Sequence, residues 1–319
     1  ACLEMIKSGT TTFNEMYFFP EAQIEAIKEM GMRAVIGLVV VDFSKMGCTK
    51  ENAQKIFFKL KDKLPLTIKF AIAPHAIYTV CTENLIWVKN FAKKSNLLIH
   101  MHLSEAEWET KESLKKYKKR PVEYLEKIGL LSKNCLFAHS IWLTEREIEI
   151  LAKRKCNLIY NPSSNLKLAS GFFPYKKISK HKINVCLGTD GPASNNSLDL
   201  IREIKIGSLL QKGIEKDPTV FSPKEAIKIL TENGARALKI KAGKILPGFL
   251  ADLILIDLDK IYFQPGHDFL ADLLFSASGD CVTDVICDGK ILMREGKIEG
   301  EEKIKNKVKN LAKNLSKKK

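Results

Sequence analysis

The feature that most constrains the fold is a regular alternation of short apolar runs with longer segments of helical character. The apolar runs are mostly continuous, which is typical of parallel strands that are buried on both faces. Because strands that alternate with helices pair in parallel, the pattern predicts an α/β protein with a parallel sheet or a (β/α)8 barrel. We expect seven strands, at residues Thr10–Glu15, Arg33–Val41, Thr67–Ala73, Leu97–His102, Cys135–His139, Asn157–Tyr160 and Asn184–Thr189.

The segments between these strands have the charge pattern of surface helices. One of them opens with Thr144 and has Glu147 three residues later, which is the signature of a capping box. The sequence predicts helices over Pro20–Met30, Thr49–Leu64, Thr82–Ser95, Pro121–Gly129, Thr144–Arg154 and Ser197–Lys212.

Seven strands are one fewer than a closed eight-stranded barrel requires. Residues Ala1–Lys7 resemble the end of an amphipathic helix that stops at Ser8 and Gly9, immediately before the first expected strand. The sequence also begins without a methionine. We therefore expect a (β/α)8 barrel that lacks its first strand, in a chain that is an N-terminally truncated form of a larger protein.

The character of the sequence changes after a further expected helix at Pro223–Leu238. Apolar runs at Leu253–Asp257, Thr283–Asp288 and Lys290–Arg294, with the tight turn Asp288-Gly289 between the last two, indicate a small antiparallel unit. The expected organisation is a barrel at residues 1–240, part of a small β-sandwich at 241–300 and a lysine-rich tail at 301–319.

The formal net charge of +15 raises the question of a nucleic-acid partner. Much of the excess is local, because Lys303–Lys319 holds eight lysines and no acid, in a stretch that could form a polar helix or fray. The remaining lysines are dispersed, and no basic stripe with interleaved aromatic residues is present. A solvated lysine-rich surface is therefore the favoured interpretation, and a nucleic-acid partner is the disfavoured one.

Cellular location can be addressed from composition alone. No apolar run reaches the roughly 18 residues that a transmembrane helix needs, so no membrane partner is expected. The eight cysteines are scattered without a Cys-x-x-Cys pair, which indicates a reducing compartment rather than a disulfide framework. We expect a cytoplasmic protein, and the sequence is compatible with a homo-oligomer.

Polar residues that can hold a metal or move a proton follow four of the apolar runs. They are His75, His102 with Glu105 three residues later, His139, and Asp190. Each has a simpler explanation when taken alone, such as a turn aspartate or a structural histidine. In a barrel of this class, however, chemistry is located at the C-terminal ends of the strands, and four such residues at strand ends favour an active site.

Longer segments carry a resemblance to a known family. Besides Ala73-Pro74-His75 and His102-Leu103-Ser104-Glu105, the segments Asn161–Gly171 and Gly188–Asn196 resemble the amidohydrolase superfamily, and more closely its 5-methylthioadenosine/S-adenosylhomocysteine deaminase branch. Thr231–Ala235, Gly248–Asp252 and Asp288–Lys290 resemble the last barrel helix and the C-terminal β-sandwich of that family. The resemblance spans the chain except for its lysine-rich tail.

The resemblance implies hydrolytic deamination of an adenosine-type nucleoside with one divalent metal, zinc or iron, of which zinc is the more usual. It implies that His102 and Asp190 are metal ligands, that Glu105 accepts a proton from the attacking water and delivers it to the purine ring, and that His139 orients the attacking oxygen or stabilises the developing oxyanion. The implied catalytic residues are Glu105, His139 and Asp190. The implied substrate contacts are His75, Glu105 and Asp190.

Two departures from the family pattern matter. The His-x-His pair of the family's first strand has no counterpart here, so we expect this chain to bind metal weakly and to turn over slowly. Family members that accept S-adenosylhomocysteine generally have an arginine after the third strand, where this chain offers only Lys45 and Lys50. Methylthioadenosine, 5′-deoxyadenosine or adenosine is therefore favoured over S-adenosylhomocysteine.

Three alternatives stay open at this point. A guanine deaminase or a triazine-type hydrolase would use the same scaffold. A non-catalytic remnant of the barrel would keep the fold and lose the reaction.

Overall fold

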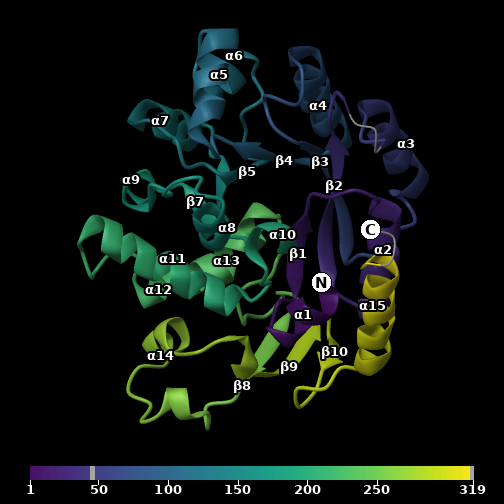
Figure 1. Ribbon diagram of the computed structural model, residues 1–319, viewed down its shortest axis with the longest axis vertical. Coiled ribbons are helices and arrows are strands. Elements are labelled where there is room, and N and C mark those ends of the chain that lie inside the picture. The colour runs from purple at the N-terminus through teal and green to yellow at the C-terminus, as the bar shows by residue number, and fades with distance from the viewer. Residues whose placement is uncertain (44–46, 317–319) are drawn as a thin grey trace.

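The protein is described by a computed structural model in which residues 1–43 and 47–316 are placed. Its centre is a parallel sheet of seven strands in the order β1 to β7, curled into a half-barrel (Figure 1). Consecutive strands pair in parallel, as in the register Thr12↔Arg33 between β1 and β2. All seven predicted strands are confirmed, at β1 Thr12–Glu15, β2 Arg33–Val40, β3 Ile68–Pro74, β4 Leu98–Leu103, β5 Cys135–His139, β6 Asn157–Tyr160 and β7 Asn184–Leu187.

Helices cover the outer side of this sheet (Figure 1). The predictions Pro20–Met30 and Thr82–Ser95 match α2 and α4 at both ends. The other helices of the half-barrel are α1 Cys2–Lys7, α3 Lys50–Leu60, α5 Glu107–Tyr117, α6 Pro121–Lys127, α7 Glu145–Lys153, α8 Pro162–Lys167, α9 Tyr175–Lys180, α10 Pro192–Asn195, α11 Leu200–Glu215, α12 Pro223–Leu230 and α13 Glu232–Ala237.

Several helix predictions need correction. The predicted helix Thr49–Leu64 ends at Leu60, and the predicted helix Ser197–Lys212 begins only at Leu200, because Asp199 caps it by accepting the amides of Ile201 and Arg202. The single helix predicted over Pro223–Leu238 is two helices. The break falls at Thr231, whose backbone leaves the helical region (φ −123°, ψ −85°).

Apolar residues on the two faces of the sheet form two separate clusters. In β2, Ala34 and Ile36 belong to the large cluster, whereas Val35 between them belongs to the smaller one. Since neighbouring strand residues point to opposite faces, the two clusters lie on opposite sides of the sheet. The smaller cluster takes one residue from each of five strands and one from α13: Val35, Ala71, Leu98, Leu136, Cys186 and Ala237.

The C-terminal part forms the antiparallel unit that the sequence predicts. Strands β8 (Leu253–Ile256), β9 (Val282–Cys287) and β10 (Lys290–Met293) form one sheet, and the short helices η1 (Ile261–Phe263), α14 (Phe269–Phe275) and η2 (Gly279–Cys281) lie between β8 and β9. The turn that joins β9 to β10 has a positive φ at both Asp288 (52°) and Gly289 (74°), the geometry that tight hairpins favour.

Most of the lysine-rich tail is helix α15, Glu301–Ser316, at the edge of the molecule (Figure 1). Its first turn is tied to α1 by an ion pair of 2.9 Å between Lys7 Nζ and Glu301 Oε2. The last three lysines of the predicted tail lie outside the described residues. Among the described residues, no helix is both long enough and apolar enough to cross a membrane.

Candidate active site

The predicted site residues lie at the C-terminal ends of four strands. His75 follows β3 directly, His102 is near the end of β4, His139 ends β5 and Asp190 comes three residues after β7. The register places Leu103 of β4 opposite His139, and the amide of His102 donates to the His75 carbonyl oxygen at 3.0 Å. Parallel pairing therefore brings the three histidines to one edge of the sheet.

The histidine rings contact one another. The ring centroids of His102 and His139 are 5.4 Å apart in a stacked arrangement, and those of His75 and His102 are 4.8 Å apart. His102 Nδ1 lies 2.9 Å from the His75 carbonyl oxygen, which can only accept, so Nδ1 carries the proton. This leaves the lone pair of His102 Nε2 available to a metal.

Burial keeps His102 and His75 neutral. It lowers the pKa of His102, and the neighbouring His139 lowers it further. Burial also lowers the pKa of His75 to about 4, with further contributions from His102 and His139. Uncharged imidazole is the form that ligates a metal, so the environment favours the chemically useful state.

Glu105 and His139 face each other across the site. Their closest atoms, Oε2 and Nε2, are 3.6 Å apart. His139 Nδ1 is 2.8 Å from Asn165 Oδ1, and the Ser170 hydroxyl donates to Glu105 Oε1 at 3.2 Å. A carboxylate next to an imidazole, each oriented by its own hydrogen bond, is suited to moving a proton and stabilising charge.

Asn165 and Ser170 were not predicted as site residues, although the segment that contains them was singled out. Both lie between Asn161 and Gly171, which includes α8. This segment was singled out because a long stretch of it resembles the family. The spacing of its residues did not show which side chains turn toward the site.

Asp190 is held in a left-handed backbone conformation (φ 60°). Its carboxylate accepts the Ser164 hydroxyl and the Gly191 amide, each at 2.6 Å. Gly188, two residues earlier, is required sterically, since a Cβ there would collide with Asn161 Oδ1. Asp190 is thus placed by the segment that also supplies Asn165.

Two further polar residues of the site come from β1 and were not predicted. Asn14 Nδ2 lies 2.8 Å from Nδ1 of His100, the second histidine of β4, whose pKa burial lowers to about 3. Burial also raises the pKa of Glu15, with an additional contribution from the charge of Asp190. The end of β1 therefore belongs to the same polar environment as His102 and Asp190.

The donor set present fits a divalent metal only in part. His102 offers a neutral nitrogen and Asp190 a carboxylate, both of which are ordinary ligands of zinc. Within residues 1–43 and 47–316, no group of three or more His, Cys, Asp or Glu side chains is arranged to hold a metal ion. A catalytic zinc site takes three protein ligands, so these two provide an incomplete set.

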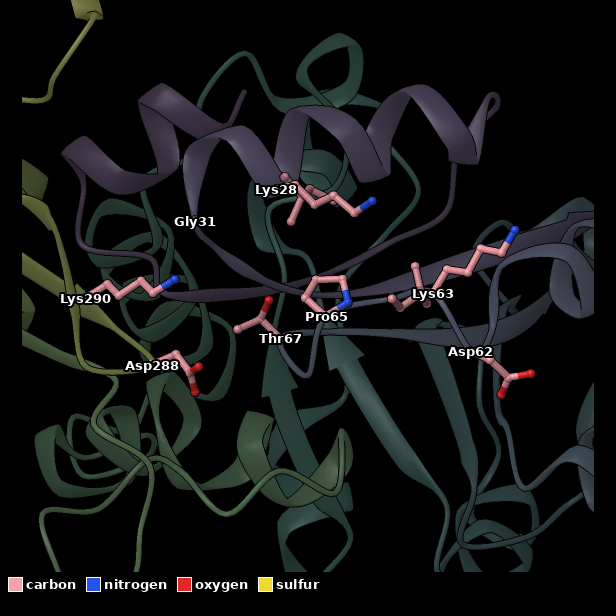
Figure 2. A pocket seen from close by; sticks show the side chains of 10 residues that line it. Lys28, Gly31, Asp62, Lys63, Pro65, Thr67, Asp288 and Lys290 are labelled. Atoms are coloured by element: carbon pink, nitrogen blue, oxygen red, sulfur yellow. The ribbon is translucent and has the colours of Figure 1, made fainter.

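Figure 2 shows a surface pocket of about 460 Å³, none of whose lining residues belongs to the candidate active site. Lys28, Lys63 and Lys290 line it together with Thr67 and Asp288. Thr67 directly precedes β3, so the pocket is at the N-terminal end of the strands. That end of a barrel normally serves stability, and we do not assign the pocket to the reaction.

Comparison with known proteins agrees with the geometry. A model described as "Amidohydrolase family" matches residues 1–292. The chain is 45% identical over 309 residues to a 5′-deoxyadenosine deaminase of Methanocaldococcus jannaschii, covering 95% of this chain and 73% of that protein. It is also 45% identical to a 5-methylthioadenosine/S-adenosylhomocysteine deaminase of Thermodesulfovibrio yellowstonii, covering 93% of this chain and 69% of the relative.

A solved structure shows the same relationship. The structure of an adenosine deaminase from Xanthomonas campestris with bound zinc superposes with a TM-score of 0.90 at 35% identity, covering 93% of this chain and 69% of that one. The predicted resemblance is confirmed by sequence and by fold. The chain belongs to the amidohydrolase family.

Proposed function

We propose that this protein catalyses the hydrolytic deamination of an adenosine-type nucleoside, giving the inosine analogue and ammonia. The observation that carries the proposal is the pairing of Glu105 Oε2 with His139 Nε2 at 3.6 Å, beside the stacked ring of His102. The two deaminases that are 45% identical to the chain support the same reaction class.

In the proposed reaction, water adds to C6 of the purine and the exocyclic amino group leaves as ammonia. Glu105 takes a proton from the attacking water and passes it to the ring nitrogen next to C6. A second proton transfer to the amino group makes it a leaving group, and Glu105 is placed to carry it. Each transfer moves one proton, so the products are the 6-oxopurine nucleoside and ammonia.

The neighbouring side chains have positioning roles in this proposal. His139, whose Nδ1 donates to Asn165 Oδ1, presents the lone pair of Nε2 to the attacking water and orients it by accepting a hydrogen bond. The Ser170 hydroxyl fixes one oxygen of Glu105 and leaves the other directed at His139. His75, beside His102 and in edge contact with Tyr78, is placed to touch the substrate.

His102 and Asp190 are the residues that would hold the divalent metal, and zinc is the metal we favour. When bound, such a metal acts as a Lewis acid that lowers the pKa of water from about 15.7 toward 7. Asp190 has one carboxylate oxygen hydrogen-bonded to Ser164 and the other to Gly191, which fixes its orientation. We assign Asp190 to catalysis and to substrate binding as well, through this fixed carboxylate.

Among adenosine-type substrates, we propose that those without an amino-acid tail are preferred. β2 ends at Val40 and is followed by Val41 and Asp42, with no arginine to pair with a carboxylate. Lys45 lies outside the described residues, and Lys50 begins α3 with its nitrogen 3.9 Å from Glu51. Exposed aromatic side chains at Tyr17 and Phe43, just after β1 and β2, suit an apolar 5′ substituent.

A substrate panel tests the proposal. The zinc-supplemented protein is incubated with 5′-deoxyadenosine, methylthioadenosine, adenosine, S-adenosylhomocysteine and guanine, and the ultraviolet change from adenine to hypoxanthine is followed together with ammonia release. We expect turnover of the first three substrates above the fourth and none of guanine. Turnover of guanine alone would identify a guanine deaminase, and a folded protein inert toward the whole panel would identify a non-catalytic remnant.

A further inference from the structure

Glu109 is a buried carboxylate beside the active site to which the mechanism above gives no role. Its side chain is 1% exposed, although it lies on α5 among residues that are otherwise strongly charged. Burial of an acid is costly unless its oxygens are hydrogen-bonded. The partners of Glu109 therefore indicate what it does.

Both oxygens of Glu109 accept backbone amides of the loop that carries Glu105. Oε1 accepts the amide of Ser104 at 3.0 Å, and Oε2 accepts the amide of Glu105 itself at 2.8 Å. Glu109 is the third residue of α5, a position from which a glutamate usually reaches back to the amide of the N-cap residue. Here the N-cap residue is Ala106, and the Glu109 carboxylate instead accepts the amides of the two residues that precede Ala106.

The loop held in this way is strained and is fixed on its other side as well. Ser104 has a left-handed backbone (φ 49°), which a non-glycine residue adopts only when its surroundings enforce it. Its carbonyl oxygen accepts the amides of Ile141 at 3.1 Å and Trp142 at 2.9 Å, from the segment that follows His139. The turn is thereby clamped between Glu109 and the loop of His139.

We propose that Glu109 is a positioning residue for deamination: its carboxylate holds the Ser104–Glu105 turn so that the Glu105 side chain faces His139. The inference rests on the proposed function, because it assigns Glu109 a role through Glu105. It predicts that loss of the two hydrogen bonds loosens one turn and slows the chemical step, while the fold and substrate binding persist.

The first test needs no turnover. Amide hydrogen exchange is compared in the unaltered protein, in Glu109→Gln and in Glu225→Gln. Glu225 is a matched control because its carboxylate accepts the Ser222 amide at 2.8 Å at the start of α12, away from the site. Because the glutamine side chain keeps only one accepting oxygen, we expect Glu109→Gln to speed exchange at one or both of Ser104 and Glu105 by about tenfold or more. In the control variant Glu225→Gln, exchange should be faster at the Ser222 amide alone.

Unchanged exchange at Ser104 and Glu105 in Glu109→Gln would overturn the proposal. Should that variant fail to fold, Glu109→Asp keeps the charge on a side chain one methylene shorter. It should then speed exchange at the same two amides, and unchanged exchange there would overturn the proposal equally.

The second test separates positioning from a general structural role. Glu109→Gln should lower kcat by about 10- to 100-fold and change KM by less than about twofold. In a Glu105→Gln background the same change should have little further effect, because both act on one group. An equal further loss in that background would overturn the proposal. A normal rate for Glu105→Gln alone would instead refute the proposed function, with the exchange result still deciding whether Glu109 holds the turn.

Discussion

The two ends of the parallel sheet differ in how their polar side chains are paired. At the C-terminal end, Ser104, His139 and Asp190 all have left-handed backbones, and buried polar atoms such as Ser140 Oγ and Asn165 Nδ2 have no hydrogen-bond partner. At the N-terminal end, Arg33 donates to both oxygens of Asp252 and to Asp288, and every contact is complementary. Unpaired polar atoms thus lie beside the candidate active site, whereas the buried charges of Arg33 and Asp252 are paired where the two sheets meet.

The ion-pair end joins the half-barrel to the small antiparallel sheet. Arg33 opens β2, whereas Asp252 precedes β8 and Asp288 belongs to the β9–β10 turn. Burial opposes the charge on Arg33, but its hydrogen bonds to Asp252 and Asp288 outweigh that cost and raise the pKa of the guanidinium. One side chain therefore links segments more than 200 residues apart in sequence.

The largest expected effect is at this end. Arg33→Met removes the positive charge that pairs with the carboxylate of Asp252, 2% exposed, and leaves it the Asp288 amide as a donor. We expect the free energy of unfolding to fall by about 3–5 kcal/mol, the usual cost of breaking a buried pair from one side. Chemical denaturation measures it, with Lys69→Gln as a control on an exposed lysine of β3. A reduced kcat with unchanged stability would reverse the assignment of the two ends.

At the C-terminal end of the sheet, Glu105→Gln should lower the rate and leave the stability unchanged. We expect kcat to fall by at least about 100-fold, because the amide can neither accept nor deliver the proton. Stability should stay unchanged, since the fold does not depend on this partly exposed side chain. Steady-state kinetics and thermal unfolding check both parts. Glu107→Gln, an exposed glutamate two residues on, is the control and should keep its rate.

Acid sensitivity should originate at the C-terminal end. The pKa of His100 is lowered to about 3 in the fold, below its ordinary value near 6.5, so between these values the unfolded chain binds more protons. Stability from this group is complete above pH ~6.5 and is lost as the pH falls toward 3. We expect His100→Asn to reduce that loss by up to about 1.4 kcal/mol per pH unit.

Denaturant unfolding at a series of pH values measures how the free energy of unfolding depends on pH. His267→Asn, at an exposed position, is the matched control and should follow the unaltered protein. Parallel curves for His100→Asn and the unaltered protein would show that His100 is not held neutral by the fold.

The smallest effect is expected from Ser170→Ala. The variant removes the hydroxyl that donates to Glu105 Oε1 at 3.2 Å and leaves the carboxylate in place. We expect kcat to fall by about tenfold or less, as for other residues that orient a catalytic group. Steady-state kinetics measures the change, with Ser179→Ala as a surface control. A loss as large as that of Glu105→Gln would mean that Ser170 itself takes part in proton transfer.

The fold was largely predictable because a strand that is buried on both faces needs a continuous run of apolar residues, and such runs can be recognised in the sequence. All seven strands follow such runs. Helix α5 was missed for the opposite reason: its buried residues are Glu109, Thr110 and Ser113, so it has no apolar stripe. The break at Thr231 was also missed, since the surrounding sequence keeps helical periodicity.

Of the candidate site, the sequence pointed only to the residues at its centre. His75, His102, Glu105, His139 and Asp190 stand at strand ends, where a parallel sheet brings distant residues together. The roles proposed for Asn165, Ser170 and Glu109 rest on contacts that depend on how loops fold back, and spacing along the chain does not encode such contacts. These proposals needed the hydrogen bonds between the loops.

The central claim is that the C-terminal end of the sheet directs water to C6 of an adenine ring. The most direct measurement is deamination of 5′-deoxyadenosine by the zinc-supplemented protein in heavy-oxygen water, with mass spectrometry of the product. The account predicts one heavy oxygen at C6 of the hypoxanthine product, formed by the unaltered protein and lost in Glu105→Gln. Absence of labelled product from the folded protein, or equal labelling by Glu105→Gln, would contradict it.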